Sequence, residues 1–210
     1  MIEINDDTPA GEGPARIPLI DASVHIFFGN NKDLRDNFLR EPFSSRGFPD
    51  YEMDWYGAPG GEYAKGTKGP NKEYPGSDVD IVARHLFADR GVDVAVLHPM
   101  TRGIMPDRHL GTALAAAHNE MMVTRWLDHP EFGDRFRGTI RVVPDDIAGS
   151  LREIGDDAKD LGLTRVAFYT DPTVAKLEPV AIATKSLKAA GIDFAIYDET
   201  EVEPTDRSFK

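Results

Sequence analysis

Two histidines occupy positions at which they could do chemistry. His25 stands near the end of an apolar run, residues 17–28, and His98 stands near the end of another, residues 92–100. An imidazole at the carboxyl end of a buried strand can hold a divalent metal or contact a substrate. Either residue could instead bond to nearby backbone or lie in an ordinary loop. His25 is therefore a candidate metal ligand, and His98 is a candidate substrate contact.

The composition limits the chemistry further. The 210 residues include no cysteine, so disulfides, thiolate nucleophiles and cysteine-bound metals are excluded, and any metal must be held by His, Asp or Glu. The formal net charge is −12, and the 24 Lys and Arg residues are dispersed, which disfavours nucleic acid as a partner.

Targeting and length are also informative. No apolar run approaches the roughly 20 residues that a membrane helix needs, and the acidic first 16 residues do not resemble a secretory signal. We expect a chain that is not a membrane protein and that resides in the cytoplasm. Its length allows one medium domain, or a small domain with part of another.

Strand-like and helix-like segments alternate along the chain. The runs that predict strands are residues 17–28, 92–100, 138–144, 164–170 and 192–199. The segments that predict helices between the later strands are residues 77–91, with Ser77 as N-cap, 107–128, 145–161 and 178–190. This alternation predicts an α/β fold with a parallel sheet, either open or curved as a partial barrel.

A long irregular segment, residues 29–76, separates the first strand from the rest, with at most a short helix near residues 33–39. It is too long for an ordinary connection and is unusually aromatic. The aromatic residues that stand out are Phe43, Phe48, Tyr51, Trp55, Tyr56 and Tyr63. The segment is either a packed excursion over a site or a partly disordered insertion.

Residues of about 17–150 resemble the amidohydrolase-related superfamily. The matching segments are IDASVH (20–25), GFPDYEMDWYGAPGGEY (47–63), PGSDVDIVARHLFADRGVDVAVLHP (75–99), AAAHNEMMVTRWL (115–127) and FRGTIRVVPDD (136–146). The resemblance implies part of a TIM-type barrel. It also implies a hydrolase or decarboxylase that uses a divalent metal, zinc or iron, on a small carboxylate-bearing substrate.

In that family the first strand ends in a His-x-His or Asp-x-His pair of metal ligands. Here the corresponding residues are Ser23 and His25, and a serine hydroxyl is a poor ligand for such a metal. His25 alone would remain. The family's further ligands, a histidine and an aspartate on later strands, have no counterpart in this chain, so the site is expected to be incomplete.

Residues of about 149–210 resemble the start of iron-containing alcohol dehydrogenases, particularly the hydroxyacid–oxoacid transhydrogenase-like group. The matching segments are EIGDDAKDLGLTRVAFYTDPTVAKLEPV (153–180) and SLKAAGIDFAIYDETEVEPTDRSF (186–209). The resemblance implies a dinucleotide-binding α/β segment. Thr170 and Asp171 would end a strand, where the carboxylate accepts hydrogen bonds from the adenine ribose of NAD, and Pro204 and Thr205 would line the cofactor.

In that family a glycine-rich turn that holds the pyrophosphate, and later an Asp and three His that hold iron, follow this segment. The sequence contains neither, so NAD binding is expected to be weak.

Three hypotheses follow for the chain as a whole. The first is a metal-dependent hydrolase or decarboxylase, incomplete or inactive by itself, that acts on a small molecule. The second is an NAD-linked oxidoreductase fragment built on the C-terminal segment. The third is a non-catalytic fusion product whose exposed sheet edges favour homo-oligomers. All three share the division into a flexible tail (1–16), a partial barrel (17–150) and a partial dinucleotide-binding segment (151–210).

Overall fold

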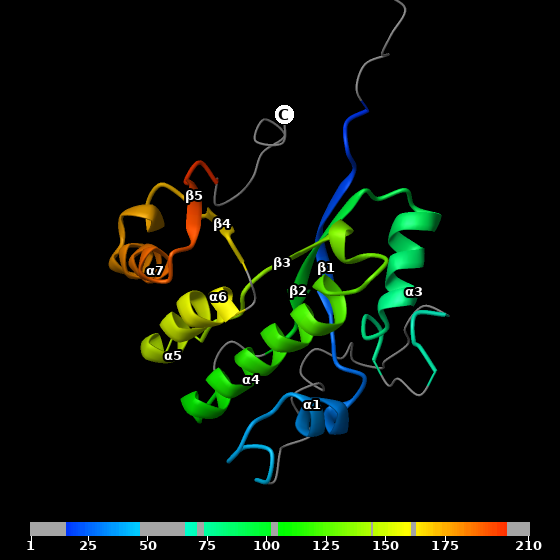
Figure 1. Cartoon of the computed structure of the whole chain (residues 1–210), viewed down its shortest axis with the longest axis horizontal. Helices are drawn as coiled ribbons and strands as arrows, with labels where there is room; N and C mark the ends of the chain where they lie inside the picture. The colour runs from blue at the N-terminus through cyan, green and yellow to red at the C-terminus, as the bar shows by residue number, and fades with distance from the viewer. Residues whose placement is uncertain are drawn as a thin grey trace, which may run out of the picture.

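The computed structural model describes residues 16–46, 66–70, 74–101, 105–143, 145–160 and 163–200, and Figure 1 shows the path of the chain. The strands are β1 (Ile20–Ile26), β2 (Val94–Pro99), β3 (Phe136–Gly138), β4 (Arg165–Tyr169) and β5 (Asp193–Tyr197). The α-helices are α1 (Asn31–Asn37), α3 (Val79–Ala83), α4 (Arg108–Met121), α5 (Ile147–Arg152), α6 (Ala158–Asp160) and α7 (Glu178–Ala189).

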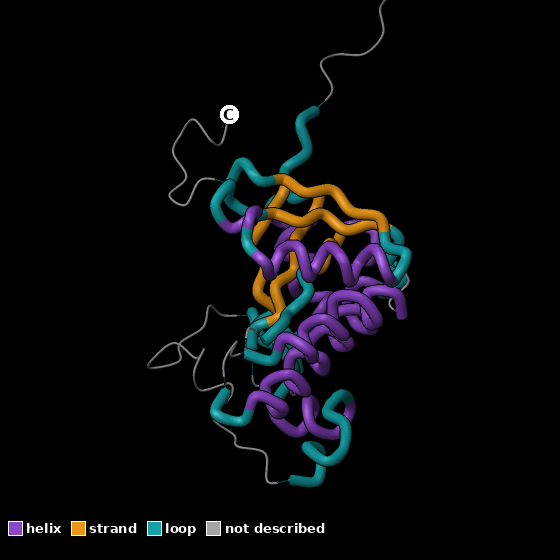
Figure 2. The backbone as a smooth tube through the Cα atoms, turned by 90° about the vertical axis from the view of Figure 1, so that its left-hand side faces the viewer, coloured by secondary structure: helices purple, strands orange, loops and turns teal. Residues whose placement is uncertain are grey.

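Among the residues that the structure describes, three π-helical segments continue these helices, and two short 3-10 turns join other elements. The π-helical segments are η1 (Arg84–Asp89), η2 (Met122–Leu127) and η4 (Glu153–Asp157). The 3-10 turns are η3 (Gly133–Arg135) and η5 (Val174–Lys176). Figure 2 shows the strands grouped in the upper part of the molecule, with most of the helices below them.

All strand pairs in the described residues are parallel, and they form two separate open sheets. The first has the order β1-β2-β3, and the second pairs β4 with β5. The predicted α/β fold with open parallel sheets is therefore confirmed. The described strands do not close into a barrel, and the β4–β5 unit forms its own sheet instead of extending the first (Figure 1).

The third strand is shorter than predicted and starts earlier. The sequence predicts a strand over residues 138–144, but β3 covers only Phe136–Gly138, where Phe136 pairs with Ala95. Thr139 adds one further bond, from its N–H to the carbonyl of Leu97 at 3.1 Å. The following apolar residues have no neighbouring strand to pair with, and an extended segment needs such a partner to satisfy its backbone.

Aspartates and an asparagine begin most of the helices. Asn30, Asp78, Asp107 and Asp146 each accept a hydrogen bond from a backbone N–H in the first turn, as N-cap residues do. Asp146 caps α5 in this way by accepting from the N–H of Gly149. The helix predicted to begin with Ser77 as N-cap is capped by Asp78 instead, while the Ser77 hydroxyl donates to the carbonyl of Tyr74 at 2.7 Å.

The main core lies between the first sheet and the long helix formed by α4 and η2. Trp126, Leu97 and Ile26 are fully buried there, and Trp126 packs edge-on against Phe136 with ring centroids 5.5 Å apart. Phe43 packs against this core, as expected of a packed excursion. The other five aromatic residues singled out in that segment lie outside the described residues: Phe48, Tyr51, Trp55, Tyr56 and Tyr63.

A smaller core joins the helix of residues 147–160 to α7. Its fully buried members include Ala158 and Leu187, and a Cβ atom on Gly155 would come within 2.4 Å of the Ser186 hydroxyl. The same helix also contacts α4, where Asn119 donates to the buried carboxylate of Glu153 at 2.9 Å. The helix therefore spans the boundary predicted near residue 150 and packs against elements on both sides of it.

Replacing Gly76 with alanine should lower the free energy of unfolding by about 2 kcal/mol. Gly76 has a φ of +72°, and an added Cβ would come 2.6 Å from the carbonyl oxygen of His25, which is backbone and cannot swing away. Gly91 is the matched control because its φ is +67° and nothing lies within 4 Å of the added Cβ. Gly91→Ala should cost only the backbone strain, about 1 kcal/mol. Urea denaturation measures both, and equal losses would contradict the clash at Gly76.

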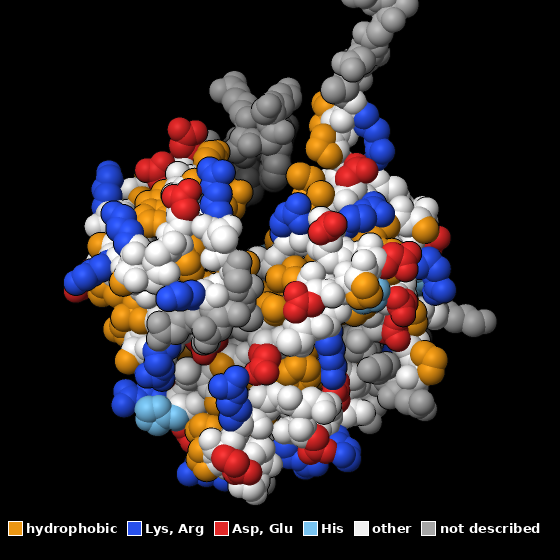
Figure 3. All heavy atoms as spheres, viewed as in Figure 1, with side chains coloured by type: hydrophobic (Ala, Val, Ile, Leu, Met, Phe, Trp, Pro, Cys, Tyr) orange, Lys and Arg blue, Asp and Glu red, His pale blue; other side chains and the backbone are white. Residues whose placement is uncertain are grey.

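No helix in the described part of the chain is long and apolar enough to cross a membrane. On the face seen in Figure 3, acidic and basic side chains are interspersed, and neither sign forms a large continuous patch.

Candidate functional site

The carboxyl end of the β4–β5 sheet holds two of the residues predicted to bind a cofactor. Thr170 follows β4 directly and is only 8% exposed. Its N–H donates to the carbonyl of Tyr197 at 2.9 Å, and its carbonyl accepts from the N–H of Thr200 at 3.3 Å. These bonds continue the pairing of the two strands and fix the backbone on which the next residue stands.

Asp171 follows Thr170 and precedes the 3-10 turn η5. Its Oδ1 accepts hydrogen bonds from the backbone N–H of Val174, at 3.0 Å, and of Thr173, at 2.8 Å. These bonds favour the carboxylate and lower the pKa of Asp171 below its ordinary value, so the group is ionised at neutral pH. Neither bond uses Oδ2. The result is a fixed, charged acceptor at the carboxyl edge of a parallel sheet.

Such an edge is where open α/β sheets bind their ligands. A carboxylate that is ionised and held by its own backbone can accept hydrogen bonds from a pair of hydroxyls without first being ordered. The other two predicted cofactor contacts, Pro204 and Thr205, lie outside the described residues, so the structure places two of the four.

The structure brings the two candidate histidines of the N-terminal part together. His25 and His98 are register partners on β1 and β2, and their rings meet edge-on with centroids 6.2 Å apart. His98 donates from Nε2 to the carbonyl of Ala22 at 2.8 Å, and its Nδ1 lies 3.2 Å from the Thr139 hydroxyl. Both ring nitrogens of His98 therefore have partners within the protein.

His25 is exposed, and the residue two positions before it on the same strand is Ser23. The described residues contain no group of three or more His, Cys, Asp or Glu placed to hold a metal ion. His25 and His98 form a neighbouring pair on the open face of the first sheet without a third ligand among the described side chains.

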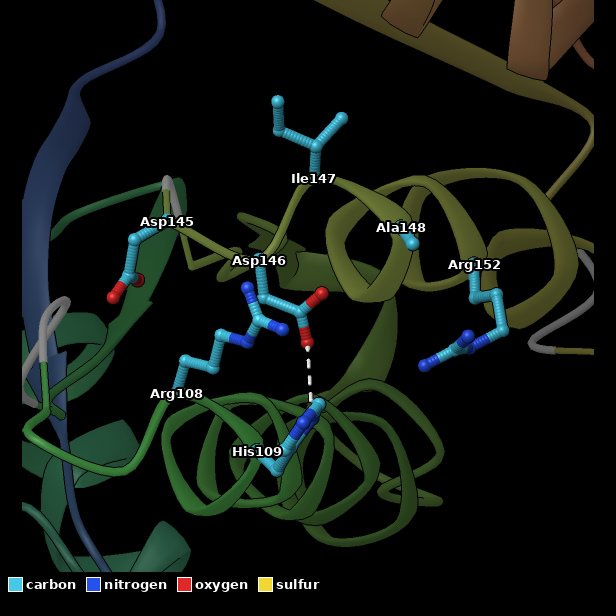
Figure 4. Close-up of a pocket in the computed structure, with 7 residues that line it drawn as sticks. All are labelled: Arg108, His109, Asp145, Asp146, Ile147, Ala148 and Arg152. Atoms are coloured by element: carbon cyan, nitrogen blue, oxygen red, sulfur yellow. Dashed lines mark ion pairs between the residues drawn. The ribbon is translucent and has the colours of Figure 1, made fainter.

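A shallow hollow of about 400 Å³ lies where α4 and α5 begin, and its lining was not predicted from the sequence. The residues around it are Arg108, His109, Asp145, Asp146, Ile147, Ala148 and Arg152. Figure 4 shows His109 facing Asp146, and the Nδ1 to Oδ2 distance is 4.0 Å. The same carboxylate accepts from the Thr112 hydroxyl at 2.6 Å and from the N–H of Gly149 at 3.1 Å. Asp146 thus links the beginning of α4 to the beginning of α5, and the hollow lies beside that contact.

Comparisons with known proteins bear only on part of the chain. No model of a known protein family matches it. Curated relatives are the mitochondrial hydroxyacid-oxoacid transhydrogenases of Pongo abelii and Homo sapiens, each 45% identical over 62 residues. The probable mitochondrial enzyme of that name from Dictyostelium discoideum is 36% identical over 69 residues. Each match covers 30% of this chain and 13% of the relative.

These relatives correct the leading functional prediction. A metal-dependent hydrolase or decarboxylase of the amidohydrolase-related type is wrong as the main function, because the relatives found are transhydrogenases and nothing in the comparisons supports an amidohydrolase. The predicted resemblance to iron-containing alcohol dehydrogenases is supported for about 30% of the chain. This chain is therefore similar, over a segment of about 60 residues, to hydroxyacid-oxoacid transhydrogenases, of which it spans about an eighth.

Proposed function

We propose that this chain contributes the adenosine-binding part of an NAD-linked oxidoreductase of the hydroxyacid–oxoacid transhydrogenase kind. The cofactor's nicotinamide would carry a hydride between a hydroxyacid and an oxoacid. The residues from β4 to β5 would bind its adenosine half. The observation that carries the proposal is the ionised Asp171 carboxylate at the carboxyl end of β4, within a parallel strand–helix–strand unit.

The described residues fit one half of a dinucleotide. Asp171 supplies a charged acceptor for the ribose hydroxyls, and Thr170 fixes its backbone against β5. A carboxylate at this place also repels a 2′-phosphate, so NADH should bind better than NADPH.

Iron does not fit the described part of the chain. No cluster of three or more His, Cys, Asp or Glu occurs among the described side chains, so no step through iron can be assigned to them. The role that these residues support is binding and orientation of the nucleotide.

Asp171→Asn should weaken NADH binding about tenfold, because a charge-assisted hydrogen bond becomes a neutral one. It should also reduce the preference for NADH over NADPH, since the repulsion of the 2′-phosphate disappears. The side-chain amide oxygen of asparagine can accept the same two backbone N–H bonds, from Thr173 and Val174, so the 3-10 turn that follows should persist. Titration of NADH fluorescence, in parallel with NADPH, measures both effects.

Asp193→Asn is the matched control. Asp193 belongs to the same sheet but lies at the amino end of β5, and its side chain is 78% exposed. Its replacement should leave both affinities unchanged. Wild-type protein that binds neither dinucleotide would refute the proposed function, and so would equal losses in the two variants.

A further inference from the structure

One face of the β4–β5 sheet is open. Parallel sheets are normally covered on both faces. Here Val166 and Phe194, whose side chains lie on one face, pack into the small core with α7. The residues of the other face are all exposed, and they pair across the strands as Arg165 with Asp193, Ala167 with Ala195, and Tyr169 with Tyr197.

The three pairs on this open face differ in character along the strands. The amino end carries an ion pair, with Arg165 Nε 3.9 Å from Asp193 Oδ2. The middle carries only methyl groups. The carboxyl end carries two tyrosines, 72% and 48% exposed, with ring centroids 5.9 Å apart and planes inclined by 54°. The large aromatic surface of this face is thus confined to the carboxyl end.

The tyrosine rings do not cover each other. Rings inclined in this way leave most of each π-face free, and an exposed aromatic face is a surface on which a planar ring stacks. The alanines beside them leave the approach from the middle of the sheet open. The charged pair of the open face, Arg165 with Asp193, lies at the opposite end of the strands from the tyrosines.

We propose that Tyr169 and Tyr197 form a stacking platform for the adenine base of the nucleotide. This inference rests on the proposed function and assigns the base-binding residues of the same site. Tyr169 stands two residues before Asp171, about 7 Å along the chain, a separation that one nucleoside can span from base to ribose. The carboxylate would hold the ribose hydroxyls while the rings select a planar base over a sugar phosphate alone.

The test compares two probes on the full chain. AMP carries the base, and ribose 5-phosphate lacks it, so their difference in affinity isolates the base. Stacking of one base on an aromatic side chain is worth about tenfold in affinity or more. Wild-type protein should bind AMP at least about tenfold more tightly than ribose 5-phosphate, as measured by isothermal titration calorimetry.

Tyr169→Ala should remove most of that difference, whereas Tyr169→Phe should preserve it because the ring remains. Tyr197→Ala provides a second, independent variant, and circular dichroism confirms that each variant is folded. An AMP affinity unchanged in both alanine variants would overturn the platform. So would wild-type protein that binds the two probes equally.

These outcomes separate the platform from the proposed function. If wild-type protein binds NADH and Asp171→Asn weakens it, but the tyrosine variants bind AMP normally, the platform is wrong and the function stands. If wild-type protein binds neither NADH nor AMP, both are wrong.

Discussion

Replacing Arg125 with alanine should lower the free energy of unfolding by about 3 kcal/mol. Its two terminal nitrogens each donate to a different oxygen of Asp33 at 2.6 Å, and the two side chains are 28% and 15% exposed. The guanidinium also lies 4.7 Å from the centre of the Phe38 ring. Removing it would leave a mostly buried carboxylate without its counter-charge, which costs far more than losing a surface pair.

The same pair gives stability a dependence on acid pH. Burial alone would raise the pKa of Asp33, but hydrogen bonds from Arg125, Gly29 and Asn37 and the charge of Arg125 lower it well below its ordinary value of 3.8. A carboxyl whose folded pKa is depressed contributes stability above its unfolded pKa, and that stability is lost as the pH falls below it. As the pH falls below 4, the free energy of unfolding of Arg125→Ala should therefore decrease less than that of wild type.

Arg40 offers a matched control for this prediction. It pairs with Glu120 at 3.3 Å, but its side chain is 86% exposed, so Arg40→Ala should cost less than about 1 kcal/mol. Arg125→Lys, which keeps the charge but not the two-pronged contact, should fall between the two alanine variants. Urea denaturation at pH 7 compares all three. If the two alanine variants lose equal stability, the contact with Asp33 is not the reason for the loss at Arg125.

Local signals made most of the elements predictable. Strands β1 and β2 come from dense apolar runs rich in Val and Ile, which are typical of a buried parallel strand. Helix α7 begins with Pro179 near its amino end and stops just before Gly191, which has a φ of +74°. The third strand was predicted too late in the sequence. The apolar residues within 140–143 have the composition of a strand, whether or not a neighbouring strand is available to pair with them.

The candidate site could be predicted only as far as the family resemblance indicates it. Asp171 was identified through the resemblance to iron-containing alcohol dehydrogenases, and in the structure it lies just after the carboxyl end of β4. The tyrosine platform was missed because Tyr169 and Tyr197 read as ordinary strand residues. Their exposure depends on which face of the sheet α7 covers. The contact between Arg125 and Asp33 joins residues 92 positions apart, and nothing local in either segment indicates it.

A second large effect on stability should come from His118 between pH 6.5 and pH 4. This side chain is completely buried, donates from Nδ1 to the carbonyl of Leu114 at 2.7 Å, and meets the Phe28 ring edge-on at 4.6 Å. Burial lowers the pKa of His118 from 6.5 to about 4, and the charge of Arg141 adds to the shift, against backbone groups of Leu114 and Met100 that favour the proton.

The direction of the effect follows from proton binding. Below pH 6.5 the unfolded chain binds a proton at this histidine and the folded chain does not, so acid favours unfolding. The contribution of His118 is fully present above pH 6.5 and is lost as the pH falls toward 4, by about 3 kcal/mol in all. This range lies mostly above that of Asp33, so the two effects can be measured separately. Urea denaturation at half-unit steps from pH 7 to pH 4.5 records the slope.

In variants of His118 the decisive quantity is the slope of the free energy of unfolding against pH, and not the absolute free energy of unfolding. His118→Gln retains an N–H that can reach the Leu114 carbonyl but does not titrate, so stability should become nearly independent of pH in this range even if the variant is less stable overall. His109→Gln is the control, because the side chain of His109 is 66% exposed and should leave the wild-type slope in place. A slope that persists in His118→Gln would mean that other groups take up the protons. A slope that disappears only in His118→Gln would identify the buried imidazole as the group that makes the fold sensitive to mild acid.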